Sequence, residues 1–239
     1  MKNASNVLVV DIGGTNIKIL TTGQNHPRSF PSGPKLRPER MISGIKELAK
    51  DWKYDVVSIG YCGVVTSGRI AAEPRNLGPG WRDFDFQAAF ESPVKIINDA
   101  AMQALGSYEG GLLLFLGMGT GLGSALVAEG AVVPMELGHL AYKQGTYEDY
   151  LGARGLERLG KKKWQKHVAF VVGRLIEGIH PDDVVLGGGN ARKLRELPPG
   201  CRLGDNSYAF VGGFRLWDPL LITGITLPGS SFARRQART

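Results

Sequence analysis

The stretch NVLVVDIGGTNIKIL, residues 6–20, decides the fold of this chain. A run of β-branched and apolar residues ends at Asp11, and Gly13, Gly14 and Thr15 follow before an apolar–polar alternation resumes. This pattern predicts two strands joined by a tight turn. Glycines in such a turn let backbone N–H groups approach an anion, and Thr15 adds a hydroxyl donor. A plain hairpin turn has the same pattern, so the stretch alone leaves both interpretations open.

The same order of parts returns in GLLLFLGMGTGLGSALVAEG, residues 111–130. Its turn holds Gly119, Thr120 and Gly121 between two apolar runs. The spacing is too long for a solenoid, so we expect two related α/β halves. Neither turn matches the dinucleotide fingerprint that opens a helix or the lysine-containing phosphate loop. Two turns in equivalent positions favour phosphate binding over plain hairpins.

Further along the chain, strand patterns alternate with helix patterns. The expected helix in PERMISGIKELAKDW, residues 38–52, precedes an expected strand in residues 55–65. In residues 94–110 a strand ends at Asn98, and a helix opens at Asp99. DDVVLGGGNARKL, residues 182–194, predicts a strand, three glycines and then a helix.

The composition favours a globular protein with one large or two small domains. The chain has 239 residues, of which 43% are hydrophobic. Its two cysteines, Cys62 and Cys201, form no disulfide framework, and no Cys or His cluster has metal-site spacing. We therefore expect a reducing compartment.

The N-terminal residues do not resemble a signal peptide, and no apolar run reaches the roughly 18 residues of a membrane span. A cytoplasmic protein without membrane contact is the expectation. The formal net charge of +7 fits two interpretations, solubility or an acidic partner such as phosphate chains or nucleic acid.

The motifs DIGGTNIK, NDA, GMGTGLG, ELGH and LGGG occur in the order and at about the spacing of the ROK family of sugar kinases, which the chain resembles over residues 6–217. The resemblance implies an α/β, two-domain actin-like and hexokinase-like (ribonuclease H-like) fold with an internal repeat. A sugar would lie in the cleft between the domains, with a phosphoryl donor above it. We expect an N-terminal domain in residues 1–107, a C-terminal domain in residues 108–217 and a flexible tail in residues 218–239.

Within that family, the chain most resembles the polyphosphate-dependent glucokinases. Many ROK proteins bind zinc through three cysteines and the histidine that corresponds to His139. Here the following segment, AYKQGTYEDYLG, contains no cysteine, so we predict no zinc. Without zinc, the role that the resemblance implies for His139 is a hydrogen bond to the sugar.

Phosphorylation of a sugar hydroxyl requires a base for the acceptor, and positive partners with a metal for the phosphoryl group. The resemblance makes Asp99 the base. An ordinary helix cap is the alternative for Asn98 and Asp99. Asp11 is the expected Mg²⁺ ligand, because Mg²⁺ needs only one or two carboxylates beside substrate phosphates. Lys18 either points toward the donor or lies on a solvated strand face.

Sugar recognition requires polar groups that reach adjacent hydroxyls. The resemblance assigns the sugar to Asn76, Asn98, Asp99, Glu136, His139 and Glu148. Glu136 and His139 can face the same way on one helical turn, whereas Glu148 could also be a solvent-exposed acid. The expected donor-binding residues are Asp11, Gly13, Gly14, Thr15, Lys18, Gly119, Thr120, Gly121, Gly187, Gly188 and Gly189.

The helix-like segment of residues 158–179 has a basic front half, where Lys161, Lys162 and Lys163 form a candidate polyanion patch or a solvated face. We therefore expect a glucose 6-kinase that uses polyphosphate or ATP, and the family suggests a homodimer. An ATP-dependent kinase of another hexose or amino sugar is the alternative.

A sugar-binding DNA regulator of the same family is less expected, because the first phosphate turn begins too early for a preceding DNA-binding domain. No nucleic-acid partner is expected either, since Trp164 is a single stacking aromatic among the charges.

Overall fold

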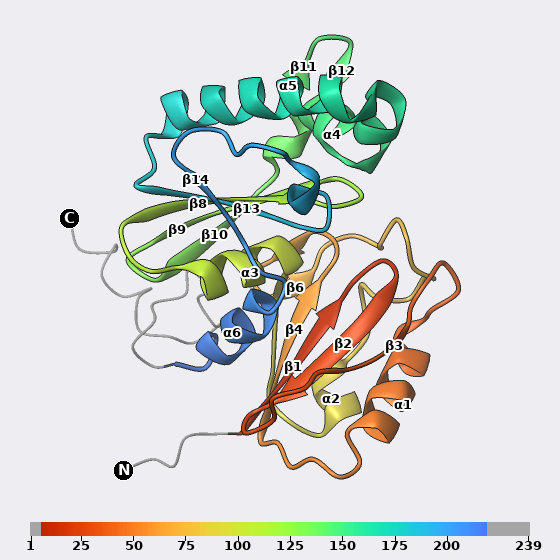
Figure 1. The fold of residues 1–239 in the computed structure, drawn as a ribbon. Helices are drawn as coiled ribbons and strands as arrows, with labels where there is room; N and C mark the ends of the chain where they lie inside the picture. The colour runs from red at the N-terminus through yellow and green to blue at the C-terminus, as the bar shows by residue number, and fades with distance from the viewer. Residues whose placement is uncertain (1–5, 219–239) are drawn as a thin grey trace, which may run out of the picture. The chain divides into compact units, whose positions relative to one another are not determined.

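The computed structural model describes residues 6–218, which form two compact units. The first contains residues 6–98 and 216–218, and the second contains residues 99–215. Each unit is built on a mixed five-stranded sheet (Figure 1). The expected α/β fold with two related halves is therefore confirmed.

The sheet of the first unit has the strand order β3-β2-β1-β4-β7. Strands β1, β2 and β3 pair antiparallel, whereas β4 pairs parallel with both β1 and β7. The strands are β1 Val7–Ile12, β2 Asn16–Thr21, β3 Arg28–Pro31, β4 Val56–Tyr61 and β7 Val94–Asn98. The predicted pair of strands around the first glycine turn is thus β1 and β2.

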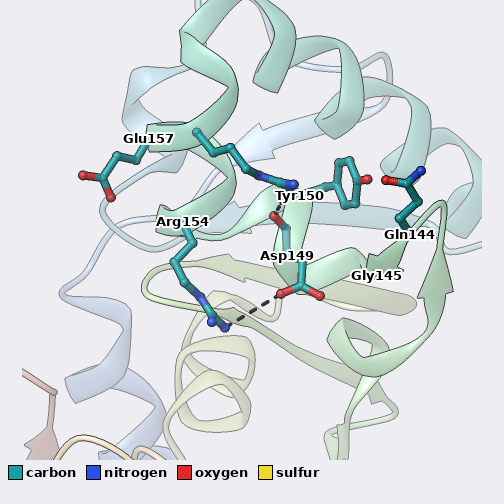
Figure 2. A pocket seen from close by; sticks show the side chains of 7 residues that line it. Gln144, Gly145, Asp149, Tyr150, Arg154 and Glu157 are labelled. Carbon is teal, nitrogen blue, oxygen red and sulfur yellow. Dashed lines mark hydrogen bonds and ion pairs between the residues drawn. The ribbon is translucent and has the colours of Figure 1, made fainter.

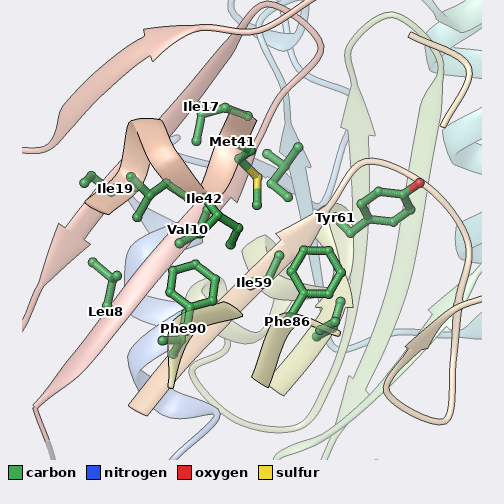
Figure 3. Close-up of a cluster of buried hydrophobic side chains, with 14 of the residues drawn as sticks. Leu8, Val10, Ile17, Ile19, Met41, Ile42, Ile59, Tyr61, Phe86 and Phe90 are labelled. Atoms are coloured by element: carbon green, nitrogen blue, oxygen red, sulfur yellow. The ribbon is translucent and has the colours of Figure 1, made fainter. Parts of the chain in front are cut away.

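One face of this sheet is covered by α1 (Pro38–Leu48) and α2 (Phe86–Phe90). Helix α1 begins at a proline, which suits the first helical turn, and it buries Met41, Ile42 and Ile45 at helical spacing. Figure 3 shows Met41 and Ile42 against alternate residues of β1, β2 and β4. A two-stranded ribbon, β5 (Val65–Thr66) and β6 (Arg69–Ile70), follows β4.

The sheet of the second unit repeats this topology, with the order β10-β9-β8-β13-β14. Its first three strands pair antiparallel and its last two join in parallel. The strands are β8 Leu112–Met118, β9 Leu122–Ala128, β10 Ala131–Met135, β13 Asp183–Gly187 and β14 Cys201–Leu203. The two glycine turns therefore occupy the same place in both sheets, between the first and second strands along the chain.

The second sheet is covered on both faces, because alternate residues of β8 are buried against different helices. Leu114 and Leu116 pack with Trp164 and Val168 of the long helix α5. The other face packs on α3, which in turn packs on α6. The helices are α3 Asp99–Ser107, α4 Tyr147–Leu151, α5 Ala153–Ile179 and α6 Tyr208–Arg215.

Helices α3 and α6 approach so closely that only glycine fits at their contact. A Cβ on Gly106 would lie 1.9 Å from the carbonyl oxygen of Tyr208, and a Cβ on Gly212 would lie 1.8 Å from that of Met102. Helix α5 bends at Gly160, whose φ of 71° is non-helical. The remaining elements are the 3₁₀ turns η1 Leu137–His139 and η2 Ala191–Lys193 and the ribbon strands β11 Ala141–Tyr142 and β12 Gly145–Thr146.

Two expectations differ from the structure. The chain passes between the units after Asn98 and not after residue 107, because α3 packs on β9 and α6. The helix expected after Gly189 is wrong: only the single turn η2 forms there, and Leu194 is already extended. Pro198 and Pro199 follow, and proline disfavours helix continuation.

Three further sequence-based expectations concern the ends of the chain, its thiols and the membrane. The expected tail lies outside the described residues, except for Asp218. Both Cys62 and Cys201 are free thiols. Within residues 6–218, no helix has the length and apolar character needed to cross a membrane.

Candidate active site

The first glycine turn is closed by a hydrogen bond within its own backbone and is stabilised by Ser32, the residue directly after β3. The Gly13 N–H donates to the carbonyl of Asn16 at 3.0 Å. The Ser32 hydroxyl donates to the carbonyl of Gly13 at 2.7 Å, and the Ser32 N–H donates to that of Thr15 at 2.9 Å. Gly14 and Thr15 remain exposed, so an anion can reach the turn.

Asp11 lies on β1 directly opposite Lys18 of β2. Burial raises the pKa of the Asp11 carboxyl from 3.8 to about 6, and the positive charge of Lys18 limits this rise. The carboxylate makes no hydrogen bond or ion pair with another residue in the described part of the chain. A partly buried carboxylate with unused acceptor positions at the head of a phosphate-type turn fits the requirements of Mg²⁺, which takes one or two carboxylates and keeps several waters.

Two predicted sugar residues belong to the first unit. Asn76 is exposed and lies beside the first turn, since a Cβ on Gly14 would be 3.8 Å from the Asn76 side chain. Asn98 ends β7, and its side-chain amide donates to the carbonyl of Gly63 at 3.1 Å. The structure therefore brings Asn76 to the turn, while Asn98 is fixed at the carboxyl end of a parallel strand.

The second glycine turn joins β8 to β9 and contacts the start of α5. The Gly119 N–H donates to the carbonyl of Gly121 at 3.1 Å, and the Ala153 N–H lies 3.1 Å from the carbonyls of both Gly119 and Thr120. Each glycine turn is therefore closed by a backbone hydrogen bond from its first glycine, although the bond spans three residues in the first turn and two in the second.

Glu148 of α4 points at the second turn. Its Oε2 accepts from the N–H of Leu122 at 3.4 Å, and a Cβ on Gly121 would lie 2.1 Å from that oxygen. Glycine at position 121 therefore makes room for the carboxylate. The alternative of a fully solvent-exposed acid is wrong, because only 20% of the Glu148 side chain is exposed.

The third glycine run, Gly187–Gly189, is followed by Asn190, which hydrogen-bonds to the second turn. The Asn190 N–H donates to the carbonyl of Met118 at 3.0 Å, and its side-chain amide donates to that of Gly119 at 2.8 Å. Lys193 donates to the Asn190 side-chain oxygen at 2.8 Å. Sequence reasoning missed Asn190 and Lys193. Their only local signal is a polar residue directly after Gly187, Gly188 and Gly189.

The expected helical turn is the 3₁₀ helix η1, which Glu136 precedes and His139 ends. The His139 Nδ1 lies 3.8 Å from the Glu136 Oε2, and about half of each side chain is exposed. Ser124 fixes the turn to β9, because its hydroxyl accepts from the Leu137 N–H at 3.1 Å. A Cβ on Gly138 would be 3.5 Å from the Glu148 Cβ. The ELGH turn, Glu148 and the second glycine turn are therefore neighbours.

Asp99 is the first residue of α3, as expected. Its Oδ1 accepts from the N–H of Ala100 at 2.8 Å, so the carboxylate lies at the positive end of the helix. A Cβ on Gly123 would be 2.8 Å from the Ala100 Cβ, which places the start of α3 against β9 just beyond the second turn. Both a cap and a catalytic base are compatible with this position.

The three lysines of the candidate polyanion patch are all exposed on α5. Lys163 lines the cavity that α5 forms with the β11–β12 ribbon. Lys161 and Lys162 lie outside that lining.

A separate cavity of about 560 Å³ lies where α4 meets α5 (Figure 2). Its charges are mixed: Arg154 is 3.8 Å from Asp149, and Arg158 donates to the Asp149 carbonyl at 3.0 Å. Glu157 adds a second carboxylate. These charges offset one another, so the cavity has no strong preference for an anion.

Among residues 6–218, no cluster of three or more His, Cys, Asp or Glu side chains could hold a metal ion. Asp11 is therefore a single carboxylate that would depend on substrate phosphates and water for the rest of a metal's coordination.

The repeated sheets and paired turns define an α/β protein of the actin-like and hexokinase-like fold class. The chain belongs to the ROK family, because the sequence profile of that family matches residues 7–155.

A relative from Mycobacterium tuberculosis named polyphosphate glucokinase is 29% identical over 213 aligned positions, which cover 80% of each chain. The solved structure of an inorganic polyphosphate/ATP-glucomannokinase from an Arthrobacter strain matches with a TM-score of 0.75 and 22% identity, covering 88% of this chain and 97% of that one.

A ROK family transcriptional regulator, described as a homologue of the E. coli MLC protein, also has the same fold. It matches with a TM-score of 0.70 and 15% identity, covering 90% of this chain and 78% of that one. The fold is thus shared by kinases and a regulator, so the residues of the site must separate these functions.

Proposed function

We propose that this protein is a sugar kinase that transfers a phosphoryl group to the 6-hydroxyl of glucose, with inorganic polyphosphate as its favoured donor and ATP as a possible second donor. The observation that carries the proposal is the glycine turn at the same place in both sheets, of which the first leaves Gly14 and Thr15 exposed to an anion. The printed names of the Mycobacterium tuberculosis and Arthrobacter proteins support the choice of sugar and donor.

Asp99 is the proposed general base. A base must hydrogen-bond to the proton that it removes, and a carboxylate at the start of a helix can project from the sheet edge toward an acceptor. The second unit gathers Asp99, the ELGH turn and Glu148 beside the second glycine turn. Glu136, His139 and Glu148 would bind the sugar hydroxyls from this unit.

The remaining sugar contacts are proposed for Asn76 and Asn98 of the first unit. The N–H groups of the first turn would bind phosphate oxygens of the donor, together with the Thr15 hydroxyl. Lys18 lies opposite Asp11, so the Asp11 carboxylate partly offsets the positive charge of Lys18. In the second unit, Asn190 and Lys193 would hold the second and third glycine runs in one donor-binding surface.

Mg²⁺ is the proposed cofactor, held by Asp11 and donor phosphates, and it would supply charge neutralisation at the transferring phosphoryl group. Asp11 fits this role because it is partly buried, has free acceptor positions and lies at the head of a phosphate-type turn. We propose that no zinc is required.

The remote part of a polyphosphate chain is proposed to lie on the exposed lysines of residues 161–163. Each phosphate placed near a lysine releases counterions, so binding should weaken as salt rises. We also propose that the protein is a homodimer, which sedimentation equilibrium can measure.

An initial-rate panel tests the proposed function. Glucose, mannose and N-acetylglucosamine are crossed with long-chain polyphosphate, ATP and GTP, and the phosphorylated sugar is identified by mass spectrometry. The highest kcat/KM is expected for glucose with polyphosphate. Transfer from ATP alone, or to an amino sugar alone, would favour the alternative kinase. Sugar binding without any transfer would favour a regulator.

A further inference from the structure

A groove of about 750 Å³ lies between α5 and the β11–β12 ribbon. Aromatic and basic side chains make up almost all of its lining, which is Ala141, Tyr142, Lys143, Tyr147, Lys163, Lys166, His167, Phe170 and Arg174. No residue of the three glycine runs takes part in it. The groove is therefore separate from the glycine runs of the proposed donor site, and it shares only Lys163 with the proposed polyphosphate patch.

The aromatic wall of the groove is held in place by contacts among its own rings. The ring centroid of Tyr142 lies 5.5 Å from that of Tyr147 and 5.9 Å from that of Phe170. The Tyr142 hydroxyl and the His167 Nδ1 are 2.9 Å apart, within hydrogen-bond distance. Tyr150 packs edge-on against Tyr142 at 5.0 Å. A planar ligand would therefore meet a preformed surface.

Phe170 shows that this wall is open to a ligand. Its side chain is 53% exposed although it belongs to a helix whose opposite face buries Trp164 and Val168. Lys163, Lys166 and Phe170 recur at helical spacing, so they lie on one face of α5. An exposed phenylalanine ring among lysines contributes little to folding, because the hydrophobic effect requires removal of the ring from water.

The charges of the groove are all of one sign. Lys143, Lys163, Lys166 and Arg174 line it, and no carboxylate does. Within residues 6–218, Lys163, Lys166 and Arg174 form no hydrogen bond or ion pair. Burial and the nearby charges of Lys143 and Arg158 lower the pKa of His167, so its ring is neutral at pH 7. The cavity shown in Figure 2 differs, because Asp149 and Glu157 offset its arginines.

We propose that this groove binds a nucleotide, with the base stacked on Phe170 and Tyr142 and the phosphates bound by Lys166, Arg174 and Lys163. A groove of this volume suits one small ligand, since ligand sites commonly enclose roughly 300–1,000 Å³. Aromatic faces stack on any base, and unpaired cations attract phosphates. Inorganic polyphosphate would use the cations and leave the rings exposed. The site does not depend on the proposed sugar phosphorylation.

The test combines photolabelling with binding measurements on the full chain. Irradiation with 8-azido-ADP should label peptides from residues 141–174. By calorimetry, ADP should bind more tightly than adenosine or tripolyphosphate, which carry only the base or only the phosphates.

Phe170→Ala should weaken ADP binding at this site by about 5- to 100-fold, the range for loss of one stacked base. A Lys166→Ala, Arg174→Ala double variant should weaken it at least about tenfold and flatten its salt dependence. Arg195→Ala is the matched control, because Arg195 is an exposed cation of the same unit that lies outside the groove lining. It should leave ADP affinity within about twofold of the parent, since it removes no groove contact.

Three outcomes would overturn the proposal. Labelling confined to peptides with Gly119–Gly121 or Gly187–Gly189 would place the nucleotide at the donor site alone. ADP affinity unchanged in both groove variants would exclude the groove. Tripolyphosphate binding as tightly as ADP, with no effect of Phe170→Ala, would make the groove a surface for inorganic anions without base stacking.

Discussion

Replacement of Asp11 by asparagine should stabilise the protein at neutral pH while it removes the proposed metal ligand. Burial raises the pKa of this carboxyl from 3.8 to about 6, so the folded protein favours its protonated form. Stability is greatest below the unfolded-state pKa and falls as the pH rises through about 6. The asparagine amide keeps the size of the side chain but has no charge to desolvate.

The magnitude follows from the two pKa values. Each pH unit between them corresponds to about 1.4 kcal/mol, so the rise from 3.8 to about 6 corresponds to roughly 3 kcal/mol at pH 7 and above. The attraction of Lys18 is already contained in the pKa of about 6, and the actual gain should be smaller because Asp11 is only partly buried and water screens its charge. We expect Asp11→Asn to raise the free energy of unfolding by about 1–3 kcal/mol at pH 7.5 and by about 0.6 kcal/mol or less at pH 4.

Urea unfolding in EDTA, followed by tryptophan fluorescence between pH 4 and pH 8.5, measures this difference. Asp83→Asn is the matched control, since Asp83 is exposed in the same unit, and this substitution should leave the free energy of unfolding close to that of the parent. In a separate series without EDTA and with a phosphoryl donor present, free Mg²⁺ at about 100 times its dissociation constant should stabilise the parent by about 2.7 kcal/mol and the Asp11 variant by clearly less. An Asp11 variant less stable than the parent at every pH, or stabilised equally by Mg²⁺, would refute this reasoning.

Three other changes test the site and the fold. Asp99→Asn should lower kcat at least about 100-fold while calorimetry still detects glucose binding, because the amide cannot accept the hydroxyl proton. Neutralising the lysines of residues 161–163 together should flatten the salt dependence of KM for long polyphosphate and leave kcat at saturation nearly unchanged. Gly212→Ala should lower the free energy of unfolding by about 3 kcal/mol or more, because the new Cβ would lie 1.8 Å from a carbonyl oxygen of α3. The control Gly173→Ala should be neutral or stabilising, because Gly173 has open space around it.

A specific result would contradict each of these three expectations. Near-full turnover in a folded Asp99 variant would remove Asp99 as the base and leave it as a helix cap. Long-chain kinetics equal to the parent's would return the three lysines to a solvated face. Equal melting temperatures for the Gly212 and Gly173 variants would show that α3 and α6 can move apart without cost.

Local patterns in the sequence were sufficient to predict the internal repeat, the strands around both glycine turns, strands β4, β7 and β13, and helices α1, α3 and α5. Strands β1 and β8 are continuous apolar runs that end at glycine turns, and α1 places its apolar residues at helical spacing. These signals are local because backbone conformation and one-sided burial depend on near neighbours in the chain. The shorter η2 turn shows the limit of such signals, since three glycines before a polar segment did not lead into a full helix.

The sequence by itself determined the two glycine turns, Asp99 at the start of a helix and the basic half of α5. Only the tertiary structure decided which residues meet: Asn190 on the second turn, Glu148 on the N–H of Leu122, and Tyr142 beside Phe170. The groove was invisible in the sequence because its aromatic residues come from a ribbon and a helix separated along the chain. Such contacts depend on strand order and on how the connecting segments cross the sheet, which no local pattern specifies.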